Sequence, residues 1–423
     1  MAFAARFPAQ AELQQTAVGR AGITPLVLVL AAALFNAALA IVNARVMPLT
    51  GNMIILFEVL IVTAGHIYVL SHFQARMVNW YFLILAFAAF ALLRIIVTGN
   101  ADAKYFRDIF LIITFILLGM TSNTQRSIQM MVVLQATVIA GIALEAICLD
   151  CYTDIFAVKD FYMSTRGIGE EEFTNLSSDL YVSATRPEAR FLPFFDLHRL
   201  SSVFLEPVSL GNFMIATVAF TAAFWTRLSS GLRAFCVGSM LLMLLASDGR
   251  LAALASVAII ALSIGHRLLP RHAALLFVPA VTGMALFVSY AAELKTGVDD
   301  LSGRIAYTAD LISNLTLNDI TGLSDRLLEQ SVDAGVVYLT ITQSLLGLTL
   351  LWSFITLSAD ESSTEQKIYK NGLLMYLALT MMVSYSFLSI KTAAPIWFTF
   401  GALLGNEPVA KAERAVQRRM RRT

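Results

Sequence analysis

The chain has 423 residues, of which 58% are hydrophobic and only 14% are charged, and its formal net charge is +1. Ordinary soluble domains carry roughly 25% charged residues, so this composition excludes a soluble globular protein. The near-neutral charge also argues against nucleic acid as a partner. We therefore expect an all-α polytopic membrane protein that forms a single integral membrane domain over residues 1–423.

Apolar runs recur along the whole chain at the length that crosses a bilayer. An α-helix needs about 20 apolar residues to cross about 30 Å of hydrocarbon. The runs predict about twelve spans, near residues 22–44, 52–72, 77–98, 106–121, 128–149, 203–226, 232–247, 251–265, 273–291, 334–358, 371–389 and 392–405. The runs that start at 106, 251 and 392 are short and also fit re-entrant elements, so eleven or thirteen spans suit the sequence as well.

Basic residues in the short loops predict the orientation of the chain. If both termini are cytoplasmic, most of these residues face inward, including the basic tail at 406–423, and few face outward, such as Arg45, Lys104 and Lys391. We expect the tail to set topology and to contact anionic lipid headgroups. The first apolar run is long enough to span and follows no cleavage site, so we interpret it as an uncleaved anchor.

Two long loops, 150–202 and 292–333, then lie together on the outer face. The first loop mixes charged residues with aromatic ones, which predicts a folded cap and not a disordered tether. Its rings suit stacking on sugars, and they suit the bilayer interface equally well. In the second loop, apolar residues from Ile305 to Leu317 recur at near-helical spacing. This pattern predicts an amphipathic helix along the membrane surface that holds Arg304 over a cavity mouth.

The cysteines carry little information by themselves. Cys148 and Cys151 form a C-x-x-C at the outer end of the fifth predicted span, and Cys236 lies inside the seventh. An oxidising compartment would permit a disulfide between the first two. Without a second pair of ligands the spacing is weak support for a metal site. We interpret it as coincidental.

The segment from Arg199 to Asn212 places charged and polar residues where a hydrophobic span is predicted to begin. A lipid-facing Glu206 would cost a few kcal/mol on insertion scales, so we expect it to face the bundle interior or a water-filled cavity. Glu206 precedes Pro207, which suits a broken helix start that lines a cavity. An equally good interpretation is that Glu206 only forms an ion pair with Arg199.

Three arginines come from widely separated segments of the predicted outer face. Arg199 opens the segment just described, Arg250 ends a Ser-Asp-Gly-Arg turn, and Arg304 lies in the second long loop. Guanidinium groups bind phosphate oxygens in pairs and stay charged at any relevant pH. Their common location predicts a ligand that carries pyrophosphate. The alternative is that each arginine pairs with a neighbouring carboxylate at the interface.

Four motifs in chain order resemble a known family. They are R-x-S-S-x-F-x-E-P-x-x-L-G-N, S-D-G-R, S-G-R and D-x-G-x-x-Y followed by L-L-G. Over roughly residues 190–350 the chain resembles the bacterial O-antigen ligase and polymerase (Wzy/WaaL) superfamily, and within it the exopolysaccharide polymerases of the xanthan-polymerase kind. The resemblance implies a GT-C-like bundle with two large periplasmic loops, located in the bacterial inner membrane. It also implies glycosyl transfer from undecaprenyl-diphosphate-linked oligosaccharides without a metal or another cofactor.

The resemblance also suggests roles for individual residues. It implies that the diphosphate is bound by Arg199, Arg250 and Arg304. The acceptor hydroxyl must lose a proton, so a nearby carboxylate is needed as general base, for which Glu206 is the first candidate and Asp333 the second. Ser209 and Asn212 are candidates for orienting sugar hydroxyls.

One departure from the family pattern separates two of its activities. Ligases of the superfamily typically carry a histidine followed by asparagine near the end of the second long loop, where this chain has Asp333, Ala334 and Gly335. The polymerase is therefore favoured over the ligase. A lipid-linked oligosaccharide flippase or exporter is the alternative from another class, but the two halves show no internal repeat. Expected partners are the lipid-linked oligosaccharide, membrane lipids, and the chain-length regulator and flippase of the same pathway.

Overall fold

The computed structural model describes residues 22–102, 104–170, 173, 179–185, 198–297 and 300–405, and within these ranges it is helical with no strand. The basic tail at 406–423 lies outside the described residues, and so do Phe191, Phe194 and Phe195 of the first long loop. The predicted all-α class is confirmed for the described part of the chain.

Each of the twelve predicted ranges contains a helix or a bent pair of helices. The first half of the bundle comprises α2 (Thr24–Ala33), α3 (Phe35–Arg45), α4 (Gly51–Ser71), α5 (Val78–Thr98), α6 (Lys104–Met120) and α7 (Thr124–Ile147). The second half comprises α11 (Pro207–Phe224), α12 (Ser230–Ser247), α13 (Arg250–Ile264), α14 (Phe277–Ala291), α17 (Gly335–Ser358), α18 (Thr364–Thr380) and α19 (Ile390–Gly405).

In the described part of the chain, 7 helices are long and apolar enough to cross a membrane, or up to 8 if α2 and α3, which are bent by 63°, form one span. The chain is thus a multi-pass membrane bundle. Several predicted boundaries were wrong, and the span expected from 128 begins at Thr124. The span expected at 371–389 corresponds to α18, which begins at Thr364 and ends at Thr380. The span expected from 203 begins only at Pro207, because the residues before it form the short 3-10 turn Ser202–Phe204.

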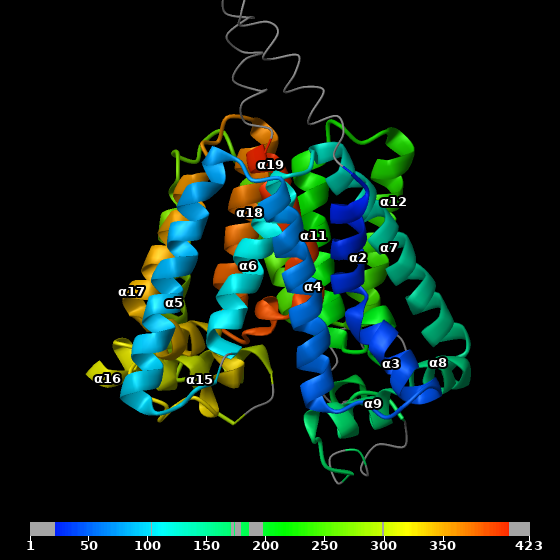
Figure 1. The fold of residues 1–423 in the computed structure, drawn as a ribbon, viewed down its shortest axis with the longest axis horizontal. Helices are drawn as coiled ribbons and strands as arrows, with labels where there is room; N and C mark the ends of the chain where they lie inside the picture. Colours follow the sequence, from blue (N-terminus) through cyan, green and yellow to red (C-terminus); the bar gives the residue numbers. More distant parts are fainter. Residues whose placement is uncertain are drawn as a thin grey trace, which may run out of the picture.

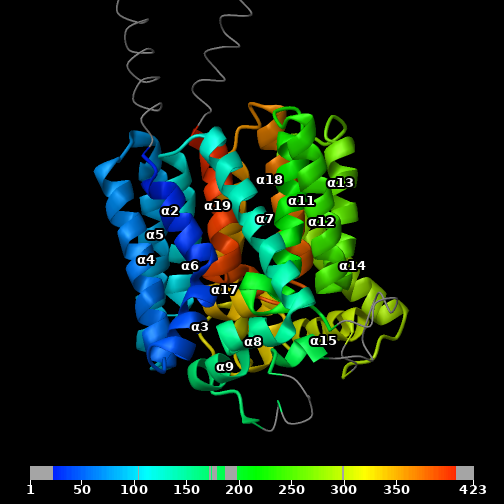
Figure 2. The same ribbon diagram turned by 90° about the vertical axis from the view of Figure 1, so that its right-hand side faces the viewer.

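Helices α6 and α19 lie at the centre of the bundle, with α4, α5 and α2 on one side and α11 to α14 on the other (Figures 1 and 2). Two glycines allow α6 and α19 to cross in backbone contact. A Cβ atom on Gly401 would lie 2.0 Å from the carbonyl oxygen of Ile116, and one on Gly119 would lie 2.2 Å from that of Phe398. Small residues at such crossings let the helices of a membrane bundle pack closely.

Both long loops lie at one end of the bundle, opposite the start of α2 and the end of α19 (Figures 1 and 2). The first loop contains α8 (Leu149–Phe156), α9 (Val158–Arg166) and the 3-10 turn Val182–Thr185; the second contains α15 (Leu301–Ser313), α16 (Leu317–Ile320) and the 3-10 turn Gln330–Asp333. The predicted surface helix is α15. It begins four residues earlier than expected, because Asp300 caps it by accepting a hydrogen bond from the backbone N–H of Gly303 at 2.8 Å.

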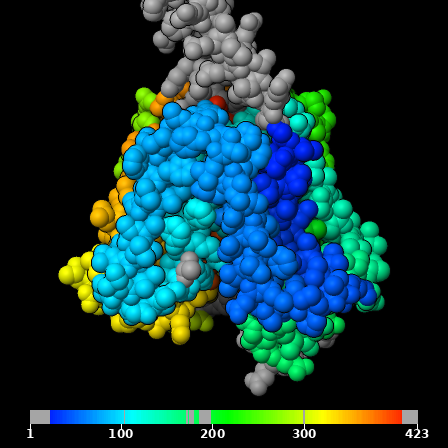
Figure 3. Space-filling view, viewed as in Figure 1, coloured from blue at the N-terminus to red at the C-terminus, as the bar shows by residue number. Residues whose placement is uncertain are grey.

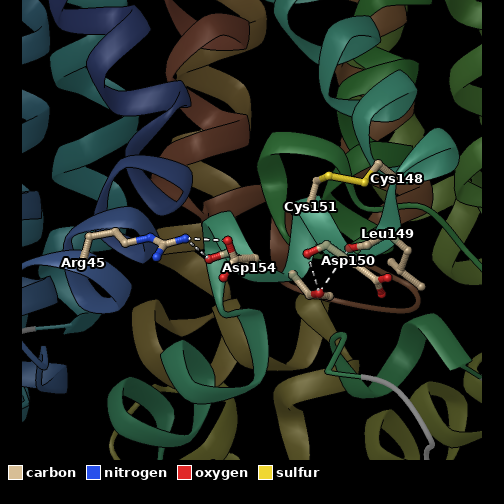
Figure 4. The surroundings of a disulfide bond; sticks show 7 residues. Arg45, Cys148, Leu149, Asp150, Cys151 and Asp154 are labelled. Carbon is tan, nitrogen blue, oxygen red and sulfur yellow. Dashed lines mark hydrogen bonds and ion pairs between the residues drawn. A yellow bond between two sulfur atoms is a disulfide. The ribbon is translucent and has the colours of Figure 1, made fainter.

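The C-x-x-C is not coincidental, which corrects the interpretation from sequence. Cys148 and Cys151 form a disulfide at the junction of α7 and α8, with their Cα atoms 5.2 Å apart (Figure 4). Close to it, Arg45 at the end of α3 pairs with Asp154 of α8 at 2.8 Å. Both links lie at the end of the bundle that carries the long loops.

Candidate functional site

The three predicted arginines line one cavity of about 160 Å³, which we name the arginine cavity. Arg199, Arg250 and Arg304 reach it from the segment before α11, the start of α13 and the start of α15. The first turns of α11, α13 and α15 also form part of its wall. Helix N-termini carry a partial positive charge and unpaired backbone N–H groups. The wall also contains the carboxylates of Asp248 and Asp300, the latter of which caps α15, but the three guanidinium groups outnumber them and give the cavity a net positive charge.

Arg199 is held in place by backbone carbonyl groups. Its Nε donates to the carbonyl oxygen of Ser247 at 2.9 Å, and its Nη1 to that of Ser183 at 3.4 Å. The following residues are anchored by Glu145 of α7, whose Oε2 accepts from the backbone N–H groups of Ser201 and Ser202 at 2.8 and 2.7 Å. Glu145 is buried, and its anchoring role was not predicted from the sequence.

Arg304 pairs with the second candidate base. Its Nη1 lies 3.3 Å from Oδ1 of Asp333, and the two side chains are 33% and 50% exposed. At the start of the same helix, the hydroxyl of Ser302 and the backbone N–H of Gly303 donate to Asp300 and hold the pKa of that carboxyl below its usual value. Asp333 is therefore a solvent-accessible carboxylate with one ion pair at the rim of the site.

Glu206 has different partners from the one predicted. Its carboxylate pairs with Lys391 of α19 at 2.7 Å and with Arg166 of α9 at 2.5 Å, and it accepts a hydrogen bond from the hydroxyl of Ser209 at 2.8 Å. The expected pair with Arg199 is thus replaced by two other cations. Burial lowers the pKa of Arg166, but the charge of Glu206, the neighbouring Tyr162 and Tyr181 and the hydrogen bond to Glu206 together raise it by more, so Arg166 stays protonated.

Lys391 was expected in a short outer loop, yet its side chain is 1% exposed inside the bundle. Besides Glu206 it donates to the carbonyl oxygen of Phe204 at 3.0 Å. A signal existed in the sequence, since Lys391 is the single charged residue of the apolar helix α19. A lone charge at such a position predicts a buried partner.

A second cavity of about 740 Å³, which we name the polar cavity, adjoins the first. Both cavities are lined by Ser183, Val208, Arg304, Ser384 and Ser386. The charged side chains in the wall of the polar cavity are the bases Lys104, Arg107, Arg166 and Arg304 and the acids Glu58, Asp108, Glu206 and Asp333. The site thus has one small cationic compartment and one larger compartment with balanced charge.

The two candidate sugar-binding residues lie in different compartments. Ser209 lines the polar cavity, where it donates to Glu206, whereas Asn212 lines the arginine cavity. The Nδ2 of Asn212 donates to the hydroxyl of Ser386 at 2.7 Å. Because Ser386 lines both cavities, Asn212 positions a polar group at their junction.

An apolar groove of about 350 Å³ leads away from the arginine cavity between α13, α14, α15 and α18. The two share Leu251, Leu301 and Val383 in their walls. The groove opens onto the outside of the bundle, where Met284 of α14 is 62% exposed. A cationic cavity and an apolar groove therefore adjoin each other across these three side chains.

Among the described residues, no group of three or more His, Cys, Asp and Glu side chains is arranged to hold a metal ion. Comparison of the chain with protein-family models, with curated proteins and with solved structures gave no match. The resemblance to the O-antigen ligase and polymerase superfamily therefore rests on the four sequence motifs.

Proposed function

We propose that the chain is a polysaccharide polymerase that joins undecaprenyl-diphosphate-linked oligosaccharide repeat units in exopolysaccharide biosynthesis. The observation that carries the proposal is that the arginine cavity and the apolar groove lie side by side and share Leu251, Leu301 and Val383 in their walls. A ligand that fits both has an anionic head and a long apolar tail. A lipid diphosphate has this chemistry, because guanidinium groups bind phosphate oxygens and hydrocarbon fills an apolar groove.

The proposal includes the finer topology. It places about twelve crossings of a GT-C-like bundle in the bacterial inner membrane, with both termini in the cytoplasm and both long loops in the periplasm. The disulfide at the loop-bearing end supports this orientation, because disulfides persist in oxidising compartments such as the periplasm. The basic residues of the short loops favour the same orientation.

In the proposed reaction, the acceptor hydroxyl oxygen forms a bond to the anomeric carbon of the donor sugar. The bond between that carbon and the diphosphate oxygen breaks, and the lipid diphosphate leaves with the electron pair. Arg199, Arg250 and Arg304 stabilise the charge that develops on the leaving group, which is electrostatic preorganisation. This chemistry needs no metal ion.

The acceptor's proton passes to a carboxylate, and the contacts favour Asp333 over Glu206 for this role. Glu206 is fixed by two cations and a hydroxyl, all within 2.8 Å, which stabilises its ionised form and weakens it as a base. Asp333 has a longer contact of 3.3 Å to Arg304 and a half-exposed side chain from which a proton can reach solvent. In this proposal Glu206 shapes the site and Asp333 accepts the proton.

The proposal is tested in the producing strain with Arg199→Lys and Arg304→Lys made separately. Lysine keeps the charge but loses the paired donors of guanidinium. We expect loss of long polymer and accumulation of single lipid-linked repeats on the periplasmic face. The matched control is Arg45→Lys, which alters an exposed ion pair at the same end of the bundle, away from both cavities.

Two outcomes would contradict the proposal. Repeats that stay on the cytoplasmic face would indicate a flippase or exporter. Polymer of normal length in both variants would leave the arginines with a structural role only. A ligase would show a third pattern, in which polymer still forms but is not transferred to a lipid A core.

A further inference from the structure

We infer that the polar cavity binds the acceptor glycan and that a lipid-linked acceptor reaches it sideways, through the hollow between α4 and α5. This inference rests on the proposed function, which assigns the arginine cavity and the apolar groove to the donor. It adds a second ligand site and a second opening toward the membrane, on another side of the bundle.

The size and charge of the polar cavity suit a neutral, hydroxyl-rich ligand. Its volume of about 740 Å³ falls within the range of about 300–1,000 Å³ that is usual for ligand pockets, whereas the arginine cavity measures about 160 Å³. Three of its four cations, the arginines, pair with acids, and the fourth, Lys104, lies over the rings of Tyr338 and Tyr385. Arg107 lies 2.8 Å from both Glu58 and Asp108, and Arg166 pairs with Glu206. An anionic ligand would have to displace these pairs.

Paired charges of this kind still offer hydrogen bonds to hydroxyl groups. A carboxylate has about four acceptor positions and a guanidinium five donors, so the contacts between them leave several of each for a ligand. The partly exposed rings of Tyr181 and Tyr385 also line the wall. Aromatic faces next to hydrogen-bonding groups form a surface on which sugar rings stack while their hydroxyls are bound.

The junction of the two cavities lies where the reaction requires it. Arg304 lines both compartments, and its partner Asp333 lines the polar one. With the donor diphosphate on the arginines, the anomeric carbon lies at this junction. An acceptor hydroxyl in the polar cavity then attacks that carbon and gives its proton to Asp333, while the bond to the diphosphate oxygen breaks.

The polar cavity has its own route from the membrane. Its wall includes residues 51–58 of α4 and the first two turns of α6, and the space-filling view shows the molecule hollowed between α4 and α5, in front of α6 (Figure 3). Ile55 lines the cavity and is 50% exposed, so its side chain connects the cavity wall with the outer surface of α4. The donor groove is formed by α13 and α14, which lie on the other side of the bundle from α4 and α5 (Figure 2). Two lipid-linked substrates can therefore be bound at once without crossing.

The test is Ile55→Trp, which places a large ring in the opening. Its matched control is Leu56→Trp, because Leu56 is the next residue of α4, is 55% exposed and does not line the cavity. Each purified variant in nanodiscs is assayed with a labelled lipid-linked repeat whose acceptor hydroxyl is blocked, so that it acts only as donor, and with the unlabelled lipid-linked repeat as acceptor. Elution as a single symmetrical peak in size-exclusion chromatography confirms that each variant is folded.

We expect Ile55→Trp to raise the KM for the acceptor at least tenfold and to leave the inhibition constant of undecaprenyl diphosphate, a probe of the donor site, unchanged. Leu56→Trp should change neither constant. An unchanged acceptor KM in Ile55→Trp, or an increased inhibition constant, would overturn the acceptor assignment. Arg199→Lys separates the two proposals, because an unchanged inhibition constant in that variant would refute the donor site and with it the proposed function.

Discussion

Replacing Lys391 with methionine removes one cation from a buried carboxylate. Lys391 is 1% exposed and lies 2.7 Å from Glu206, which is 9% exposed. Methionine has a similar length and no charge, so the change leaves Glu206 with Arg166 as its remaining cation. The variant therefore measures the contribution of the buried ion pair to the stability of the bundle.

The expected magnitude follows from the burial of both groups. Breaking a buried ion pair by removing one partner typically costs about 3–5 kcal/mol, because the other charge stays buried. Arg166 still neutralises part of that charge, so we expect about 3 kcal/mol for Lys391→Met. Removing both charges with Glu206→Gln and Lys391→Met leaves no buried carboxylate, and we expect the double variant to lose only about 1–2 kcal/mol.

The free energies of unfolding are measured by titration with a denaturing detergent in mixed micelles. The exposed pair of Arg45 and Asp154 is the control, and Arg45→Met should cost at most about 1 kcal/mol. The reasoning predicts that the double variant is more stable than Lys391→Met alone. A double variant as unstable as the sum of the two single changes would refute it, since the two residues would then act independently.

Three further predictions concern packing, sidedness and pH. Gly401→Ala should greatly reduce the yield of folded protein, because its Cβ would lie 2.0 Å from a backbone carbonyl oxygen of α6. The control is Gly231→Ala, which should not reduce the yield, because no atom lies within 4 Å of the added Cβ. Equal yields of the two variants would contradict the close crossing of α6 and α19. A membrane-impermeant maleimide should label Cys148 and Cys151 in periplasm-exposed membranes only after reduction, and labelling without reduction would contradict the disulfide. Burial alone would raise the pKa of Asp319, but hydrogen bonds from neighbouring donors together lower it by more. The ionised carboxylate therefore stabilises the folded protein. This stabilisation is complete above the ordinary carboxyl pKa of about 3.9 and is lost as the pH falls through the pKa of the folded state. Amide exchange in residues 316–326, corrected for intrinsic rates, should thus rise in acid for the wild type and already at neutral pH for Asp319→Asn.

Parts of the site follow from the sequence because their signals are local. Charged residues at the edge of an apolar run are costly in lipid, and this cost indicated that Glu206 faces the bundle interior. A second signal, the common location of Arg199, Arg250 and Arg304 on the predicted outer face, brought together three residues that line one cavity. The partners of Glu206 could not be predicted, because Arg166 and Lys391 are far from it in sequence and meet it only when α9 and α19 pack beside α11.

The sequence by itself determined the all-α class, the approximate positions of the membrane helices and the presence of two long polar loops. These features depend on the length and hydrophobicity of contiguous segments, which each segment carries in its own residues. Only the tertiary structure decided that the arginine cavity joins an apolar groove on one side and a polar cavity on the other. Cavities are the spaces left between helices from distant parts of the chain, so their walls are fixed by packing and not by any single segment.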